Sequence, residues 1–357
     1  MEDPRPNTSN NVKYPLEELM FLVISASVSG LDEWKQIAAF GKMKLEWLRK
    51  FFPYQEGIPW AGTLGRVFAQ LDNHAFELAF IDWVSNLSKM TKGQVVAVDG
   101  KRMCGSYDKA DEKAAIHIVS AYATDQGVCL GQQATDAKSN EITTIPALLD
   151  LLTLEGCTVT IDAMGCQRDI SQKILDKKAD YILQVKNNQK ALMEQVEKVF
   201  NIAAVSSQHT NNNIDHGRIE QRTCRTINDL TFFDDYKDWP GLKSLVQVKA
   251  SRIDKATGKQ ESSIRYYISS KIADASTFNH DIRAHWAIEN KVHWVLDVTF
   301  GEDKSRKRKG DSAKNASLVS KIALALIEQH QDGKATRPEK RLNALLNDAY
   351  REKILKI

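Results

Sequence analysis

The sequence lacks the features of a secreted or membrane-spanning protein. Its 357 residues include five cysteines, which form no CxxC pair and no regular framework, so disulfide bonds are not expected to hold the fold together. No apolar run reaches about 18 residues, and the start of the chain carries no charged region followed by an apolar stretch. We therefore expect a soluble protein in a reducing, cytoplasmic compartment, without a membrane partner.

The chain also has little net charge, +3 at pH 7, which by itself does not predict a nucleic-acid partner. The basic residues are unevenly spread, however, and one short segment contains five of them: Lys304, Arg306, Lys307, Arg308 and Lys309. Such a segment can be a solvated loop, or it can neutralise DNA phosphates. Further candidates for DNA contact follow strand-like segments: Lys101, Arg102 and Lys186.

Three acidic residues stand in distinctive local settings. Asp99 ends an apolar run over residues 95–99 and precedes Gly100, so we expect it at the carboxyl end of a buried strand, where the backbone turns at the glycine. Asp162 ends a similar run, and Glu289 lies in a helical pattern that can lay one carboxylate beside two strand ends. A single strand-end aspartate commonly only caps a turn, but the three acids together favour a shared site.

The three acids are suited to bind Mg²⁺, because this ion prefers oxygen ligands and is usually held by a few carboxylates, water and phosphate. Two ions about 3.5–4 Å apart can activate water or a 3′-hydroxyl and stabilise the leaving oxygen, so no protein nucleophile is needed. We therefore predict two Mg²⁺ ions, replaceable by Mn²⁺, at Asp99, Asp162 and Glu289, and phosphoryl transfer on DNA.

From about Tyr14 to about Leu326 the chain resembles the H-repeat-associated transposases, a group of bacterial insertion-sequence DDE transposases that includes proteins encoded beside Rhs elements. The most specific blocks are AVDGK (97–101), TIDAMGCQ (160–167), YILQVKNNQ (181–189), HWAIEN (285–290) and HWVLDV (293–298). By this resemblance, Asp99, Asp162 and Glu289 are the first, second and third catalytic acids. The family also has a basic stretch after the third acid, which favours DNA contact by residues 304–309.

The resemblance implies cleavage of double-stranded DNA at insertion-sequence ends and strand transfer into target DNA. It also implies a homodimer on DNA and a place at the bacterial nucleoid. Two alternatives stay open: a domesticated nuclease of the same fold that cuts without joining, and a catalytically inactive DNA-binding relic. The sequence does not reveal the terminal repeats, the target sequence, or whether a hairpin intermediate forms.

The predicted fold is α/β, with a ribonuclease-H-like mixed sheet, flanking helices, a β-rich insertion and a small helical N-terminal domain. Three strands, a helix, a strand, a helix and a strand follow one another from residue 95, which should put Asp99 and Asp162 on neighbouring central strands. The stretch between Asp162 and Glu289 is longer than one strand and two helices need, which implies the insertion. The expected divisions are a flexible arm (1–13), the helical domain (14–90), the catalytic domain (91–204 and 271–335), the insertion (205–270) and a C-terminal helix (336–357).

The helical pattern around Glu289 leaves alternatives open. His285, Glu289, His293 and Asp297 recur every four residues and should share one face. The two histidines with Glu289 could in principle bind Zn²⁺, although no HExxH motif is present and the aspartates favour a hard ion. The alternatives to Glu289 as third acid are, in order, Asp297, Glu302 and Asp303.

Related transposases surround the third acid with a Tyr-x2-Arg-x3-Glu-x6-Lys signature, of which this chain keeps only the glutamate. His285 stands at the arginine position, where it either contacts phosphate or is a semi-buried histidine. Trp286 and Trp294 are predicted mainly as core residues, with stacking on a displaced base as the alternative.

Overall fold

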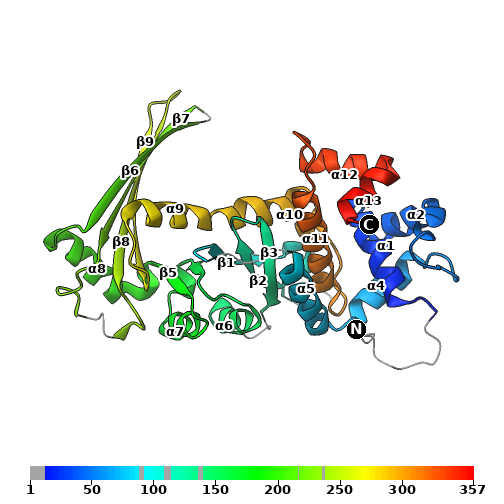
Figure 1. Ribbon diagram of the computed structural model, residues 1–357, viewed down its shortest axis with the longest axis horizontal. Helices are drawn as coiled ribbons and strands as arrows, with labels where there is room; N and C mark the ends of the chain where they lie inside the picture. The colour runs from blue at the N-terminus through cyan, green and yellow to red at the C-terminus, as the bar shows by residue number, and fades with distance from the viewer. Residues whose placement is uncertain (1–12, 88–91, 108–113, 136–139, 216, 235–237) are drawn as a thin grey trace.

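The computed structural model describes residues 13–87, 92–107, 114–135, 140–215, 217–234 and 238–357. The predicted arm falls outside this set apart from Lys13. Within the described residues, nine strands form one mixed sheet in the order β3-β2-β1-β4-β5-β9-β8-β7-β6 (Figure 1). This sheet, its flanking helices and the helical N-terminal part confirm the predicted fold class.

The first five strands form the half of the sheet that carries the acidic residues. β1, β2 and β3 form an antiparallel meander, and β4 and β5 run parallel to β1 on its other side. The apolar residues of β1 and all of β4 are buried, as their continuous apolar runs indicated. The bounds are β1 Val95–Arg102, β2 His117–Ala123, β3 Val128–Ala134, α6 Glu141–Leu151, β4 Thr158–Ile161, α7 Arg168–Asp176 and β5 Asp180–Val185.

One expectation about β1 is wrong, because the chain does not turn at Gly100. β1 continues to Arg102, since antiparallel pairing with β2 still supplies backbone hydrogen-bond partners beyond Asp99. The parallel pairing with β4, by contrast, ends where Val98 lies opposite Ile161. Asp99 therefore lies where the parallel pairing stops and not where its strand stops.

Two long hairpins make up the β-rich insertion. β9 pairs antiparallel with β5, so the insertion prolongs the main sheet and does not form a separate layer. The β8–β9 turn begins at Asp254, which accepts hydrogen bonds from the backbone N–H groups of Ala256 and Thr257. The bounds are α8 Lys190–Ile202, β6 Ser207–Asp215, β7 Arg218–Ile227, β8 Ser244–Asp254, β9 Gln260–Ser269 and α9 Ala275–His285.

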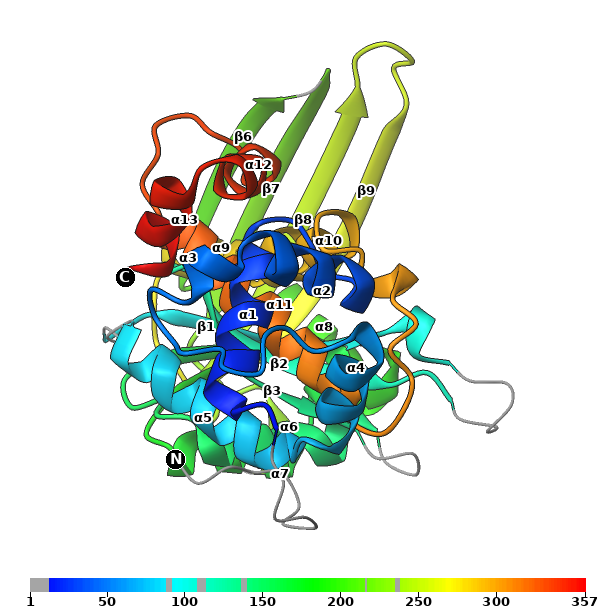
Figure 2. The same ribbon diagram turned by 90° about the vertical axis from the view of Figure 1, so that its right-hand side faces the viewer.

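Helices from both ends of the chain pack together at the end of the molecule opposite the insertion (Figures 1 and 2). The Arg341 guanidinium donates a hydrogen bond to the Ser27 carbonyl at 2.9 Å, and the Trp47 indole donates to the Glu352 carboxylate at 2.8 Å. The bounds are α1 Leu16–Val28, α2 Trp34–Met43, α3 Leu45–Leu48, α4 Ala61–Gln70, α5 Asn73–Leu87, α11 Ser312–Gln329, α12 Arg337–Leu346 and α13 Asp348–Leu355.

The predicted C-terminal helix is two helices. The helical path breaks at Asn347, whose side chain accepts a hydrogen bond from the Tyr350 N–H and so caps the start of α13. The break separates α13 from α12, and the two helices contact each other. The described chain therefore ends in two short helices instead of one.

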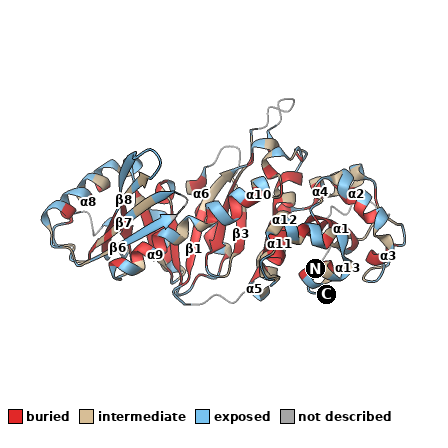
Figure 3. Cartoon of the chain, turned by 90° about the horizontal axis from the view of Figure 1, so that it is seen from above, coloured by how far each residue is buried: buried red, intermediate tan, exposed pale blue. Residues whose placement is uncertain are grey.

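One hydrophobic cluster runs from the N-terminal helices through α11 into the sheet. α11 is buried around most of its circumference, as expected of a helix enclosed by other elements. Figure 3 shows buried residues concentrated along β1, β3 and α11, whereas one face of α8 and much of β6 are exposed. In the part of the chain that is described, no helix has the length and apolar character that crossing a bilayer requires.

Candidate active site

Parallel pairing of β1 with β4 brings the first two acids together. Because Val98 lies opposite Ile161, the next residues, Asp99 on β1 and Asp162 directly after β4, follow at adjacent positions. Asp162 Oδ1 also accepts a hydrogen bond of 3.0 Å from the Met164 N–H, so this carboxylate caps the 3₁₀ turn that follows β4. Asp162 therefore both caps this turn and lines the cavity that it shares with the other two acids.

A π-helical turn supplies the third acid. α9 ends at His285, residues Glu289–His293 form the π turn, and α10 covers Trp294–Val298, so the predicted helix is interrupted. Such turns are rare and occur frequently at functional sites. Here the turn places Asp99, Glu289 and His293 so that one ligand atom of each lies within 4.8 Å of the other two.

His293 is a buried residue for which sequence reasoning found no role beyond the zinc alternative. Its Nδ1 lies 3.1 Å from Glu289 Oε2 and 3.5 Å from Asp99 Oδ2. Burial lowers the pKa of its ring to about 3, and the charges of Lys321 and Lys101 act in the same direction, so the imidazole is neutral at pH 7.

His285 does not join this cluster. Its Nδ1 lies 3.0 Å from Thr160 Oγ1 on β4, and burial lowers the pKa of its ring. Among the described residues the grouping suited to a metal contains His293 and not His285, which argues against the two-histidine zinc site. His285 still lines the cavity beside the acids, so a phosphate contact by this residue stays a prediction.

Glu141, the first residue of α6, is a fourth acid beside the site that sequence reasoning missed. A Cβ built on Gly100 would lie 2.0 Å from Glu141 Oε1, so the glycine leaves room for this carboxyl group. The same Oε1 lies 3.0 Å from His117 Nε2. The signal that could have found it is Gly100 itself, because a glycine inside a strand often marks a close approach as well as a turn.

Burial is the main cause that raises the pKa of Asp99 to about 7, and the charges of Asp162, Glu141 and Glu289 contribute to this rise, whereas a hydrogen bond from the Gly100 backbone opposes it. Crowded carboxylates of this kind are stabilised by a bound cation. The donor set consists of carboxylate oxygens and one imidazole, which fits Mg²⁺ or Mn²⁺.

A cavity of about 360 Å³ opens beside the three acids. A second hollow of about 650 Å³ continues from it along β5 and β9, and both are lined by Asp162, Lys186 and Arg265. Lys186 is exposed and was predicted to contact DNA. Arg265 was missed, because only the β5–β9 pairing brings the insertion to this position.

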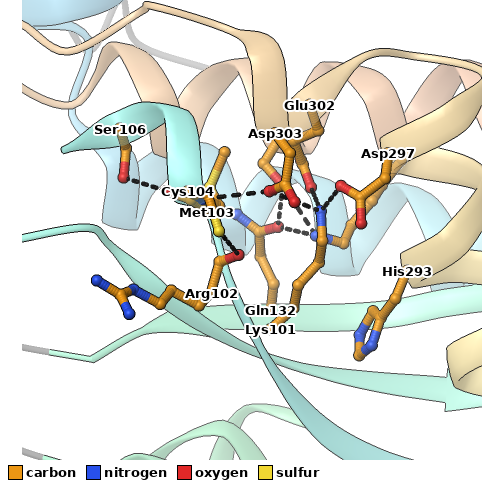
Figure 4. A network of polar contacts seen from close by, with 12 residues as sticks. Lys101, Arg102, Met103, Cys104, Ser106, Gln132, His293, Asp297, Glu302 and Asp303 are labelled. Atoms are coloured by element: carbon orange, nitrogen blue, oxygen red, sulfur yellow. Dashed lines mark hydrogen bonds and ion pairs between the residues drawn. The ribbon is translucent and has the colours of Figure 1, made fainter.

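The structure corrects the prediction that Lys101 contacts DNA. Its ammonium donates to Glu302 Oε2 at 2.6 Å and also contacts the Asp297 carboxylate, and its side chain is only 11% exposed (Figure 4). The prediction failed because β1 continues past Asp99 and carries Lys101 into the interior. Asp297 and Glu302 are therefore engaged by a lysine, which disfavours them as the third acid, whereas Arg102 is exposed.

The basic segment is divided between the surface and the interior. Lys307 is buried, donates to the Asp32 carbonyl at 2.8 Å and lies 5.0 Å from the centre of the Trp34 ring, so its predicted DNA contact is wrong. Arg308 is partly buried and its Nε donates to the Gly105 carbonyl. The exposed members are Lys304, Arg306 and Lys309.

The two tryptophans near the third acid are not core residues, which corrects the prediction. Trp286 is 46% exposed and Trp294 is 56% exposed, because Ile288 and Val292 occupy the positions that face the core. The Arg265 guanidinium lies 5.3 Å from the centre of the Trp286 ring. An exposed aromatic ring beside an arginine at the cavity is available to a planar partner.

The mixed sheet, with one acid on β1, a second directly after the parallel strand β4 and a third on a helical turn, defines a ribonuclease-H-like fold of the DDE type. Residues 90–326 match the family model of the transposase DDE domain, and residues 1–84 match the family described as DDE_Tnp_1-associated. The chain belongs to the transposase DDE domain family.

Curated relatives agree with this assignment. The chain is 45% identical to "Putative transposase YncI" of Escherichia coli O157:H7, over 99% of this chain and 92% of that protein. It is 36% identical to "H repeat-associated putative transposase YhhI" of Escherichia coli strain K12, over 96% and 93% of the two chains. Among solved structures, a piggyBac transposase synaptic complex with hairpin DNA matches with a TM-score of 0.43 and 10% identity, over 99% of this chain and 76% of that one.

Proposed function

We propose that this chain is a metal-dependent transposase that cuts DNA at the ends of an insertion sequence and joins the freed 3′-hydroxyl to target DNA. The main support is the convergence of Asp99, Asp162 and Glu289, from two parallel strands and a π turn, on one open cavity. Membership of the transposase DDE family supports the same chemistry.

The three acids would share two Mg²⁺ or Mn²⁺ ions, with Asp99 contributing to both positions, Asp162 to one and Glu289 to the other. When bound, such ions supply charge neutralisation and activation of water or a hydroxyl group. The residues of the chain itself would bind the ions and hold the acids in position. The Met164 N–H fixes the Asp162 carboxylate. Pairing of β1 with β2, which extends before and after Asp99, fixes the backbone of Asp99.

The proposed DNA partner is double-stranded, both at the element's ends and in the target. Lys186 and Arg265 line both cavities beside the acids, where they could contact backbone phosphates. The exposed Trp286 could stack on a base displaced from a DNA end. A homodimer on DNA would bring two ends together, and the bacterial nucleoid is the expected location.

The experiment is cleavage and strand transfer on labelled DNA that carries the element's ends, in Mg²⁺ or Mn²⁺, with the intact protein and Asp162→Ala. We expect cut and joined products from the intact protein and none from the variant. Asp169→Ala, at an exposed position on the following helix, is the matched control and should keep both activities.

Other outcomes would count against the proposal. Cutting without joining would favour a nuclease of the same fold. DNA binding without either activity, in the intact protein and the variant alike, would contradict catalysis altogether and leave a DNA-binding relic.

A further inference from the structure

One buried histidine lies inside the cluster of acids with no part in the function proposed above. His293 is only 4% exposed, and its Nδ1 faces Glu289 Oε2 at 3.1 Å and Asp99 Oδ2 at 3.5 Å. Its other ring nitrogen, Nε2, is buried and has no hydrogen-bond partner within the described part of the chain. The polar contacts of the ring are therefore directed at the first and third acids.

These separations match those of ligands on one metal ion. With ligands at about 2.1 Å from a divalent ion, neighbouring ligand atoms in octahedral geometry lie about 3 Å apart, and opposite ones about 4.2 Å. The two distances from Nδ1 are close to the first value, and the three ligand atoms all lie within 4.8 Å of one another. One ion can thus be reached by Asp99, Glu289 and His293 together.

We propose that His293 is the nitrogen ligand of the ion held by Asp99 and Glu289. This inference rests on the proposed function and specifies one of its two metal positions. Mg²⁺ strongly prefers oxygen ligands, whereas imidazole suits first-row transition metals, so this mixed position should prefer Mn²⁺ or Co²⁺ to Mg²⁺. The position shared by Asp99 and Asp162 has carboxylate ligands only, so the two positions differ in their metal preference.

The alternative to metal binding is that Nδ1 carries the ring proton and donates a hydrogen bond to the carboxylates. Because Nε2 has no partner among the described residues, no second hydrogen bond fixes which nitrogen holds the proton. The two possibilities differ in one observable property. Only a ligating nitrogen couples directly to the electron spin of a bound paramagnetic ion.

The test is pulsed electron paramagnetic resonance of Mn²⁺ bound to the intact, metal-stripped protein without DNA. We expect a coupling to ¹⁴N that disappears in His293→Ala and persists in His285→Gln, which changes the nearby histidine outside the cluster. Calorimetric titration should show the ratio of Mn²⁺ to Mg²⁺ affinity falling by about tenfold or more in His293→Ala. His293→Asn serves the same purpose if the alanine variant does not fold.

The spectrum of the unaltered protein can overturn the assignment without any variant. Absence of bound Mn²⁺, or bound Mn²⁺ without nitrogen coupling, overturns the assignment of His293 as a ligand. Cleavage is measured separately, so the two proposals can fail independently. A protein that cuts and joins DNA without the coupling keeps the proposed function, whereas coupling without cleavage keeps only the metal ligand.

Discussion

At Gly100, the absence of a side chain leaves space for the Glu141 carboxyl group beside β1. Glu141 approaches from the start of α6, where Asn140 caps the helix by accepting a hydrogen bond from the Ile142 N–H. Burial raises the pKa of Glu141, whereas the nearby His117 lowers it. The arrangement of the site thus depends on the missing side chain at Gly100 as well as on the acidic side chains around it.

We expect Gly100→Ala to destabilise the protein by about 1–3 kcal/mol, because the added methyl group overlaps with the Glu141 carboxyl group. Chemical denaturation measures the loss. Gly100→Ala combined with Glu141→Ala removes the overlapping atoms, so the double variant should lose less than the sum of the single variants. Simple additivity would contradict the proposed close contact.

At this scale the sequence predicted the three acids but misplaced several basic and aromatic residues. Asp99 and Asp162 were recognisable because each ends a local apolar run. Whether Lys101 and Lys307 lie at the surface depends on partners far along the chain, Glu302 and Asp32, which no local pattern reveals.

At the scale of elements, β1 is tied to the segment after the π turn by the ion pairs of Lys101. The side chains of Lys101 and Glu302 are 11% and 5% exposed, so the pair is shielded from water. Desolvation opposes and the carboxylates favour the charged lysine, and the pKa of Lys101 is raised as a net result. These contacts hold the helical segment that follows Glu289 against β1, the strand that carries Asp99.

We expect Lys101→Met to destabilise the protein by up to about 3 kcal/mol, because it removes the ion-pair partner of the buried Glu302 carboxylate and leaves only the nearby charge of Lys321. Thermal unfolding measures the effect, and adding Glu302→Gln to the variant should recover part of the loss. Lys259→Met breaks an exposed ion pair with Glu261 and should change stability little. Equal effects of the two lysine variants would rule out the structural role of Lys101.

Glu77 on α5 is buried near the charges of Lys314 and Lys321 on α11, and it makes stability dependent on pH. Burial raises its pKa to about 7, while Lys314 and Lys321 oppose the shift. A carboxyl group whose pKa is higher in the folded than in the unfolded state stabilises the fold below the unfolded value, and this stability is lost as pH rises through about 7. The shift from 4.5 corresponds to about 3 kcal/mol.

Glu77→Gln cannot titrate, so we expect the variant to gain stability relative to the intact protein between pH 5 and pH 8. Unfolding midpoints of both proteins at the two pH values measure the gain. Glu46→Gln, at a side chain that is 91% exposed, is the control and should show no such trend. A constant difference between Glu77→Gln and the intact protein would contradict the raised pKa.

The type and order of the elements were largely predictable, because apolar periodicity is local. The predicted order of three strands, a helix, a strand, a helix and a strand from residue 95 is observed as β1 to β3, α6, β4, α7 and β5. The π turn at Glu289, the pairing of β9 with β5 and the break at Asn347 were not predictable, since each depends on contacts between distant segments.

At the scale of the whole molecule, the insertion and the helical end lie on opposite sides of β1, the strand that carries Asp99 (Figure 1). The fold class followed from the order of strands and helices together with the family resemblance. The domain boundaries stay predictions, because α11 and the N-terminal helices share one hydrophobic cluster with the sheet. The contribution of exposed basic residues to DNA binding can be measured from how the affinity for DNA depends on salt concentration.

We expect a triple alanine variant of Lys304, Arg306 and Lys309 to bind DNA more weakly and with a shallower dependence on salt. Each phosphate contact that is lost should reduce the slope of log affinity against log salt by about one. Lys307→Ala removes a buried lysine of the same segment and should leave the slope unchanged. Fluorescence anisotropy at several salt concentrations provides the measurement, and an unchanged slope in the triple variant would exclude this segment from the interface.

The most direct test of the central claim is strand transfer from a pre-cut element end, supplied with either a 3′-hydroxyl or a 3′-deoxy terminus. We predict joined products only from the 3′-hydroxyl end, only with Mg²⁺ or Mn²⁺, and none with Asp99→Asn. Failure to join the 3′-hydroxyl end, or joining that persists in Asp99→Asn, would contradict transposition chemistry at this site.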